Sequence, residues 1–144
     1  MERGELREKI RIDALSWVGT PFHHEAMVKG VGVDCIHLLV AVFSEVGMLP
    51  KVKPEHYAPD WCLHSSREIL LEGIKQYAVE VQTPWMVGDI LVYRYGRAAS
   101  HCGIYIGDDQ IVHAANRGQV RCELVANGSL EKRFVGGYRL CRLS

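Results

Sequence analysis

The chain has 144 residues, of which 48% are hydrophobic and 24% are charged. That is enough apolar material for one hydrophobic core, so we expect a single domain spanning residues 1–144. The 17 basic and 17 acidic residues balance without any block of like charge, so the electrostatics give no reason to expect nucleic acid or an anionic membrane as a partner.

No segment of the sequence predicts membrane insertion or Sec-dependent export. The first residues lead into charged helical sequence, and no apolar stretch approaches the roughly 20 residues of a membrane span. The odd number of cysteines, five, and their wide spacing argue against a disulfide framework and fit a reducing compartment. We therefore expect cytoplasmic synthesis.

The first half of the chain predicts helices. Apolar residues recur at helical spacing over 3–18, and a glycine-rich loop follows over 19–33. Residues 34–46 are apolar nearly all round and stop before Gly47, which predicts a buried central helix. After an irregular segment rich in proline, Ser65 and Glu68 form a capping-box pattern for a helix reaching to about Tyr77.

The second half predicts short strands separated by turn residues. Strands are expected at 79–81, 89–95, 101–106, 110–114, 120–124 and 134–143. Helices followed by antiparallel strands indicate an α+β fold, in which the central helix packs on the sheet.

Cys35 stands at the predicted start of the central helix, directly after Asp34, a residue type that caps helices. Unpaired backbone N–H groups and the positive end of the helix dipole stabilise a thiolate at this position. Cys35 is therefore a candidate nucleophile.

His101 and His113 are candidate partners. If residues 107–109 form a three-residue hairpin loop, Gly103 lies opposite His113, and the two histidines share a face as diagonal neighbours about 7 Å apart. Gly103 leaves room for both rings. In a thiol relay Cys35 would attack a carbonyl, His101 would act as base and then acid, and His113 would orient His101. A structural thiol and ordinary strand histidines also fit these positions, so the residue types alone leave both interpretations open.

Five motifs together resemble the NlpC-type family of papain-like cell-wall peptidases. They are Trp17 to Phe22 (WVGTPF), Gly32 to Cys35 (GVDC), Gly88 to Leu91 (GDIL), Ser100 to Gly107 (SHCGIYIG) and Ile111 to Ala114 (IVHA). The compact length, the long loop between Pro21 and Gly32, and the segment from Tyr57 to Trp61 are similar to the subgroup encoded beside phage tail genes.

The resemblance implies a circularly rearranged papain-like core and a γ-D-glutamyl–diamino acid endopeptidase acting on peptidoglycan stem peptides. It implies Cys35, His101 and His113 as the catalytic triad, with no metal and no cofactor. The similarity to the tail-associated subgroup makes phage tail proteins candidate partners. The lack of a Sec signal fits delivery to the periplasm by a virion or a contractile injection device, and it also fits cytosolic recycling of wall fragments.

Two departures from the family concern the residues around the nucleophile. Ile36 and His37 stand where the family often has Ser-Gly, and Phe22 stands where a tyrosine hydroxyl often assists the oxyanion hole. His23 or His24 could supply that donor instead, with Asp34 and Phe22 as further substrate-side residues. His37 is expected on a polar stripe with Ser44 and Glu45.

A metal site is the competing use of these residue types. Residues two apart on a helix point about 200° from each other, so Cys35 and His37 cannot face one ion. Cys62 and His64, in an irregular segment, could share an ion but lack a Cys-x-x-Cys partner. Two other functions stay open: a structural tail-tip component with a weak or inactive site, and another thiol-based amidase or acyltransferase.

Overall fold

The structure is a computed structural model that describes residues 2–49, 57, 61 and 68–144. Its α-helices there are α1 (Arg3–Ser16), α2 (Cys35–Glu45) and α4 (Ile69–Lys75), and its short 3₁₀ turns are Glu131–Arg133 and Cys141–Leu143. The strands are β1 (Met27–Val28), β2 (Gly32–Val33), β3 (Ala78–Val81), β4 (Ile90–Tyr95), β5 (Ala98–Gly107), β6 (Gln110–Ala114), β7 (Val120–Leu124) and β8 (Phe134–Leu140).

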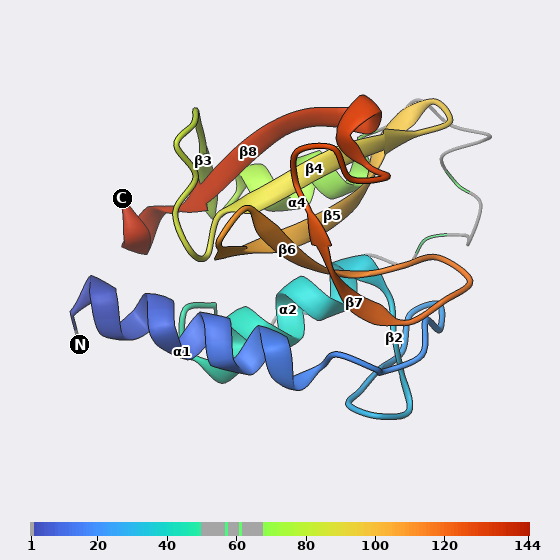
Figure 1. The fold of residues 1–144 in the computed structure, drawn as a ribbon, viewed down its shortest axis with the longest axis horizontal. Helices are drawn as coiled ribbons and strands as arrows, with labels where there is room; N and C mark the ends of the chain where they lie inside the picture. Colours follow the sequence, from blue (N-terminus) through green and yellow to red (C-terminus); the bar gives the residue numbers. More distant parts are fainter. Residues whose placement is uncertain (1, 50–56, 58–60, 62–67) are drawn as a thin grey trace.

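Six strands form one antiparallel sheet in the order β3-β8-β4-β5-β6-β7. In Figure 1, α1 and α2 lie along the lower side of this sheet. The predicted α+β fold, with the Cys-bearing helix packed on an antiparallel sheet, is confirmed.

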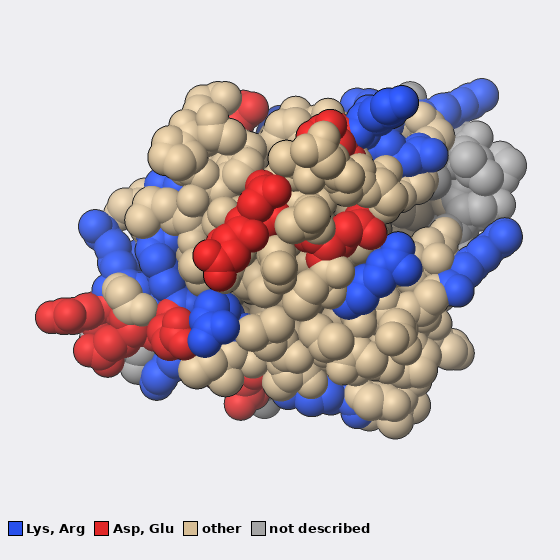
Figure 2. All heavy atoms as spheres, viewed as in Figure 1, with Lys and Arg blue, Asp and Glu red and all other residues tan. Residues whose placement is uncertain are grey.

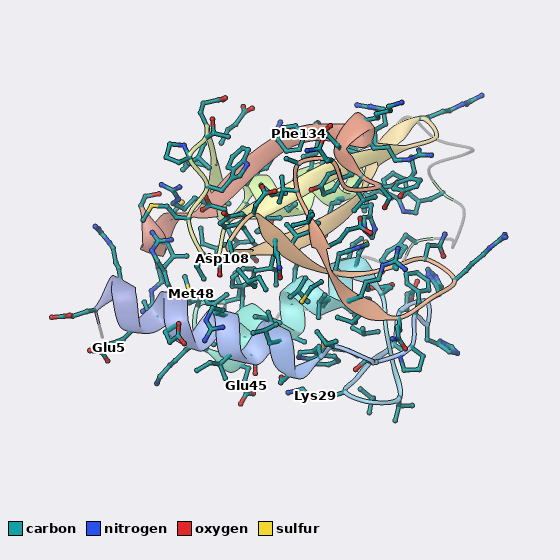
Figure 3. All side chains as sticks on the ribbon, in the orientation of Figure 1. Glu5, Lys29, Glu45, Met48, Asp108 and Phe134 are labelled. Atoms are coloured by element: carbon teal, nitrogen blue, oxygen red, sulfur yellow. The ribbon has the colours of Figure 1, made fainter. Side chains whose placement is uncertain are left out.

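The two faces of the sheet carry separate apolar clusters. The helices pack against inward residues of the central strands, among them Val92, Cys102, Ile104 and Val112. The opposite face holds a smaller cluster with Leu91, Tyr93, Ile111 and Leu130. Figure 3 shows Phe134 on this side, with the sheet between it and α1. The central strands β4, β5 and β6 are therefore largely buried on both faces, whereas β3 and β7 at the edges of the sheet carry exposed side chains.

The helices are shorter than expected. Helix α1 ends at Ser16 rather than residue 18, because the N–H groups of Trp17 and Val18 bond to carbonyls three residues back and tighten the last turn. Helix α2 begins and ends almost as predicted, and Gly47 follows with a positive φ of 78°. Helix α4 spans Ile69–Lys75, and the predicted cap Ser65 lies outside the described residues.

The loop expected over 19–33 contains a small hairpin that the sequence did not predict, in which β1 pairs with β2. Strands β6 and β7 have the predicted bounds, whereas β5 is longer and Asp89 precedes β4. The strand expected to run to residue 143 instead ends at Leu140 and continues as a 3₁₀ turn.

Asp89 ties the end of β4 to β8. Its carboxylate is fully buried and accepts two hydrogen bonds from Arg139, from Nε at 2.8 Å and Nη2 at 2.9 Å, and one from the Met86 N–H. A buried carboxylate needs such compensation, because an unpaired charge is costly away from water. This pairing explains Asp89 as a structural residue.

The surface carries no dominant sign of charge on the face shown in Figure 2, where acidic and basic side chains are interspersed. In the described part of the chain, no helix has the length and apolar character needed to cross a bilayer.

Candidate active site

Helix α2 begins at Cys35 and is capped by Asp34. The Asp34 backbone is extended, and its Oδ1 accepts the His37 N–H at 2.9 Å, so one of the unpaired donors of the first turn is satisfied. Cys35 occupies the first helical position, where its own N–H has no intrahelical partner by the geometry of the helix. The Cys35 side chain is buried, with 8% of its surface exposed.

Asp34 gathers donors from three parts of the chain. Its carboxylate also accepts from the His37 ring at 2.8 Å, from the Glu25 N–H at 2.7 Å and from the Tyr57 hydroxyl. Burial opposes ionisation, but the hydrogen bonds from His37 and Tyr57 outweigh it and hold the pKa of Asp34 below its usual value. Asp34 is thus an anionic anchor beside the thiol.

A bulge in β5 brings the strand to Cys35. The register with β4 shifts by one residue here: Tyr93 pairs with His101, but the next residue, Arg94, pairs with Ala99. Ser100 is the extra residue, and its carbonyl accepts from the Cys35 sulfur at 3.5 Å. Bulges of this kind re-aim side chains and occur beside active sites.

His101 and His113 lie in contact on neighbouring strands. Ile104 pairs with Val112, which puts Gly103 opposite His113 as predicted. His101 Nε2 lies 2.9 Å from His113 Nδ1, and the rings are perpendicular. The predicted shared face is confirmed.

The predicted turn between these strands is wrong. Asp108 and Asp109 both have positive φ, and Gly107 pairs with Gln110 after a shift at Tyr105. The connection is therefore a tight turn on Asp108 and Asp109 with a bulge before it, instead of a three-residue loop. The bulge absorbs one residue, so the register at the histidines is unchanged.

The surroundings of Cys35 favour the thiolate. The neighbouring Cys102 thiol and the His101 imidazole, acting against burial, lower the pKa of Cys35 to about 5. Burial, together with His101 and Arg121, lowers the pKa of His113 to about 3, so His113 is neutral near pH 7. A thiolate, an imidazole and a neutral orienting histidine are the groups that nucleophilic attack on a carbonyl requires.

The other predicted site residues, Phe22, His23 and His24, lie in three different surroundings. Phe22 is half-buried against the core, and its N–H donates to the Gly118 carbonyl. His23 is exposed. His24 joins the Asp34 cluster: its Nε2 lies 2.8 Å from the Tyr57 carbonyl and its Nδ1 lies 3.9 Å from Asp34 Oδ2.

His37 lies on the side of α2 that also carries Ser44 and Glu45, as expected, but its ring is engaged in contacts that the sequence did not predict. It is turned toward Asp34 and the Tyr57 hydroxyl, because capping of α2 by Asp34 brings the first helical turn and the carboxylate together. Cys62 and His64, the metal-ligand pair that the sequence left open, lie outside the described residues. Within the described residues, no group of three His, Cys, Asp or Glu side chains is arranged to hold a metal ion.

Three residues near the site were missed as functional candidates. The Cys102 sulfur donates to the Cys35 carbonyl at 3.5 Å. The Tyr57 hydroxyl donates to Asp34, and Glu123 on β7 lies beside His113. The alternation of β5 indicated that Cys102 faces the core but gave no sign of its contact with Cys35. Glu123 could have been identified only from the register between β6 and β7.

The sequence matches a known protein family. Residues 19–139 match the sequence profile of the NlpC/P60 family. A probable endopeptidase of Mycobacterium tuberculosis is 31% identical over 105 residues, which are 73% of this chain and 22% of that protein. A probable endopeptidase of Haemophilus influenzae is 26% identical over 143 residues, covering 92% of this chain and 77% of that protein.

A solved structure agrees in fold. The NLP/P60-family protein similar to a lipoprotein from Staphylococcus aureus superposes with a TM-score of 0.68 at 17% identity, covering 94% of this chain and 41% of that chain. This chain therefore spans less than half of the matched S. aureus chain and about a fifth of the mycobacterial relative.

The Cys35 environment predicts an unusual pH dependence of alkylation. Because the thiolate forms as pH rises through the thiol pKa, iodoacetamide should react with wild-type Cys35 with a midpoint near pH 5. In His101→Ala the midpoint should move up toward the ordinary thiol value of about 8.5. Peptide mass spectrometry would follow Cys35 separately from the other thiols. A wild-type midpoint near 8.5 would contradict the structure.

The close packing around Gly103 predicts that a side chain added there would disturb the two histidines. A Cβ there would lie 3.0 Å from Ile111 Cδ1, 3.1 Å from the Val112 carbonyl oxygen and 3.2 Å from His113 Cβ. Gly103→Ala should therefore separate the histidines, raise the alkylation midpoint and cost about 1–3 kcal/mol of stability by overpacking. Gly136→Ala is the matched control, since its Cβ would meet its nearest neighbour at 3.5 Å. Equal effects from both substitutions would refute this role for Gly103; urea denaturation measures the stability.

Proposed function

The chain belongs to the NlpC/P60 family, and from this premise we propose that it is a cysteine peptidase that hydrolyses peptidoglycan. The observation that carries the proposal is the arrangement of Cys35, His101 and His113. The thiol stands at a helix N-terminus with its pKa lowered to about 5, and the two histidines are paired at 2.9 Å on the adjoining strands. The likeness of the chain to probable endopeptidases supports it further.

In the proposed reaction the Cys35 thiolate attacks the carbonyl carbon of a peptide bond and forms a tetrahedral intermediate. The N–H of Cys35, at the positive end of α2, stabilises the oxyanion. His101 then gives its proton to the leaving amine, and the carbon–nitrogen bond breaks to leave an acyl-enzyme. Water, deprotonated by His101, attacks the thioester and releases the acid and the thiol.

We propose the γ-D-glutamyl–diamino acid bond of the stem peptide as the scissile bond. The support is the resemblance in the five motifs around Cys35, His101 and His113. Phe22 and Ile36 depart from the family at substrate-side positions, so the experiment must resolve the bond that is cut as well as the activity.

The experiment compares wild type with Cys35→Ala on whole peptidoglycan and on a soluble stem tetrapeptide, with products identified by mass spectrometry. We expect cleavage after D-glutamate by wild type and a loss of at least about 10³-fold in Cys35→Ala, because the nucleophile is removed. Cys122→Ala, which removes an exposed thiol on β7, is the control and should keep full activity.

The alternatives appear as distinct outcomes of that experiment. Cleavage of a different amide by wild type alone would retain the thiol mechanism and replace the substrate, as for another amidase or acyltransferase. No product from either substrate, together with slow alkylation of Cys35, would favour a structural component with an inactive site.

We further propose that the protein is part of a phage tail and acts in the periplasm after delivery by the virion. The support is the similarity of the Tyr57 to Trp61 segment to the subgroup encoded beside phage tail genes. Mass spectrometry of purified tail particles from a strain that produces the protein should detect the chain at a fixed ratio to tail proteins. Its absence from intact particles would refute the tail assignment and leave the hydrolase proposal standing.

A further inference from the structure

The ring of His113 has a second nitrogen that faces away from His101. This atom, Nε2, is buried and has no hydrogen-bond partner among the described residues. Glu123 Oε2, on the neighbouring strand β7, lies 3.7 Å from it. The histidine is 2% exposed, so water does not readily replace a missing partner there.

The strand register puts this carboxylate on the correct face. His113 pairs with Arg121 and Ile111 pairs with Glu123, so Glu123 is the diagonal neighbour of His113. The groups that face His113 from the adjacent strands are His101 on β5 and Arg121 and Glu123 on β7. Glu123 is the carboxylate among them.

Other contacts hold the Glu123 carboxylate in place. The Ser129 hydroxyl donates to Oε2 at 2.8 Å, and Arg121 Nη2 donates to Oε1 at 3.4 Å. The Glu123 side chain is 15% exposed. A carboxylate fixed by two donors presents its charge to the ring rather than swinging into solvent.

The contact between the two histidines can be made in two ways. Either His101 Nε2–H donates to His113 Nδ1, or His113 Nδ1–H donates to His101 Nε2. In the first case neutral His113 carries its proton on Nε2, where it points at Glu123. In the second case a lone pair would face the carboxylate, which is repulsive. The charge of Glu123 therefore selects the first arrangement.

We propose that Glu123 is a positioning residue that fixes the tautomer of His113 and, through it, the nitrogen that His101 presents to Cys35. With one proton held on His101 Nε2, its Nδ1 is the nitrogen that takes up the thiol proton when the thiolate forms. The inference rests on the proposed roles of Cys35 and His101, and it adds a fourth side chain to the relay. In metal-binding histidines, too, the hydrogen bond made by one ring nitrogen sets the protonation state of the other.

The test reads tautomers directly in the free protein. Nitrogen-15 NMR of the histidine rings at pH 7, recorded in a Cys35→Ala background where no thiolate pairs with His101, should show His113 protonated on Nε2 and unprotonated on Nδ1. Glu123→Leu replaces the carboxylate acceptor with an apolar side chain of similar size, so both tautomers of His113 should be populated. Glu123→Gln should partly restore the wild-type pattern, because its amide oxygen still accepts a hydrogen bond.

The second readout is the pH profile of Cys35 alkylation. We expect the midpoint to rise and the rate at pH 6 to fall roughly 10-fold in Glu123→Leu, by analogy with the loss of an outer partner of a metal-bound histidine. Glu123→Gln should lie between this variant and wild type. Ser129→Ala, which loosens the carboxylate, should shift the profile in the same direction by less.

Glu131→Gln is the matched control for losing one negative charge, since the Glu131 carboxylate accepts the Asn127 N–H. An unchanged His113 tautomer in Glu123→Leu, or an equal shift in Glu131→Gln, would overturn the inference. If Glu123→Leu does not fold, Glu123→Gln and Ser129→Ala decide by the same two readouts. Neither readout needs a substrate, so failure of this inference is distinguishable from failure of the proposed hydrolysis.

Discussion

The site depends first on the register between β5 and β6. A shift of one residue would carry His113 to the opposite face of the sheet and break its contact with His101. The register is held by buried pairs such as Ile104 with Val112, so the energy that packs the core also aligns the two rings. Gly103 supplies the space between them. Folding and chemistry thus share one set of contacts.

The second requirement is that His101, whose side chain lies on one face of the sheet, meets Cys35, which begins a helix packed on the opposite face. His101 faces the smaller apolar cluster with Tyr93 and Tyr95, while Cys35 begins a helix packed on the opposite face. The bulge at Ser100 lies where these surroundings meet, and its carbonyl touches the thiol. Burial of Cys35 would oppose a thiolate on its own; Cys102, His101 and the helix N-terminus offset that opposition.

Much of this arrangement could be predicted from the sequence, because its signals are local. Strand alternation identified the face of His101, and the apolar run after Asp34 identified the central helix. The hairpin turn was wrong, yet the register was right, because a bulge took up the residue that the shorter turn released. What could not be predicted depends on contacts between distant segments. His37 turns inward because Tyr57 and Asp34 meet there, and Glu123 gains its neighbour only through the pairing of β6 with β7.

The Asp34 carboxylate has a consequence for the motions of the site. It joins the segment around Glu25, the first turn of α2 and Tyr57, and Tyr57 in turn donates its N–H to Glu25 at 3.2 Å. Opening any one of these segments takes a donor away from a buried charge, so the carboxylate couples their openings energetically. Removal of this one carboxylate should therefore speed amide exchange at Glu25, His37 and Tyr57 together, although these residues lie far apart in the sequence.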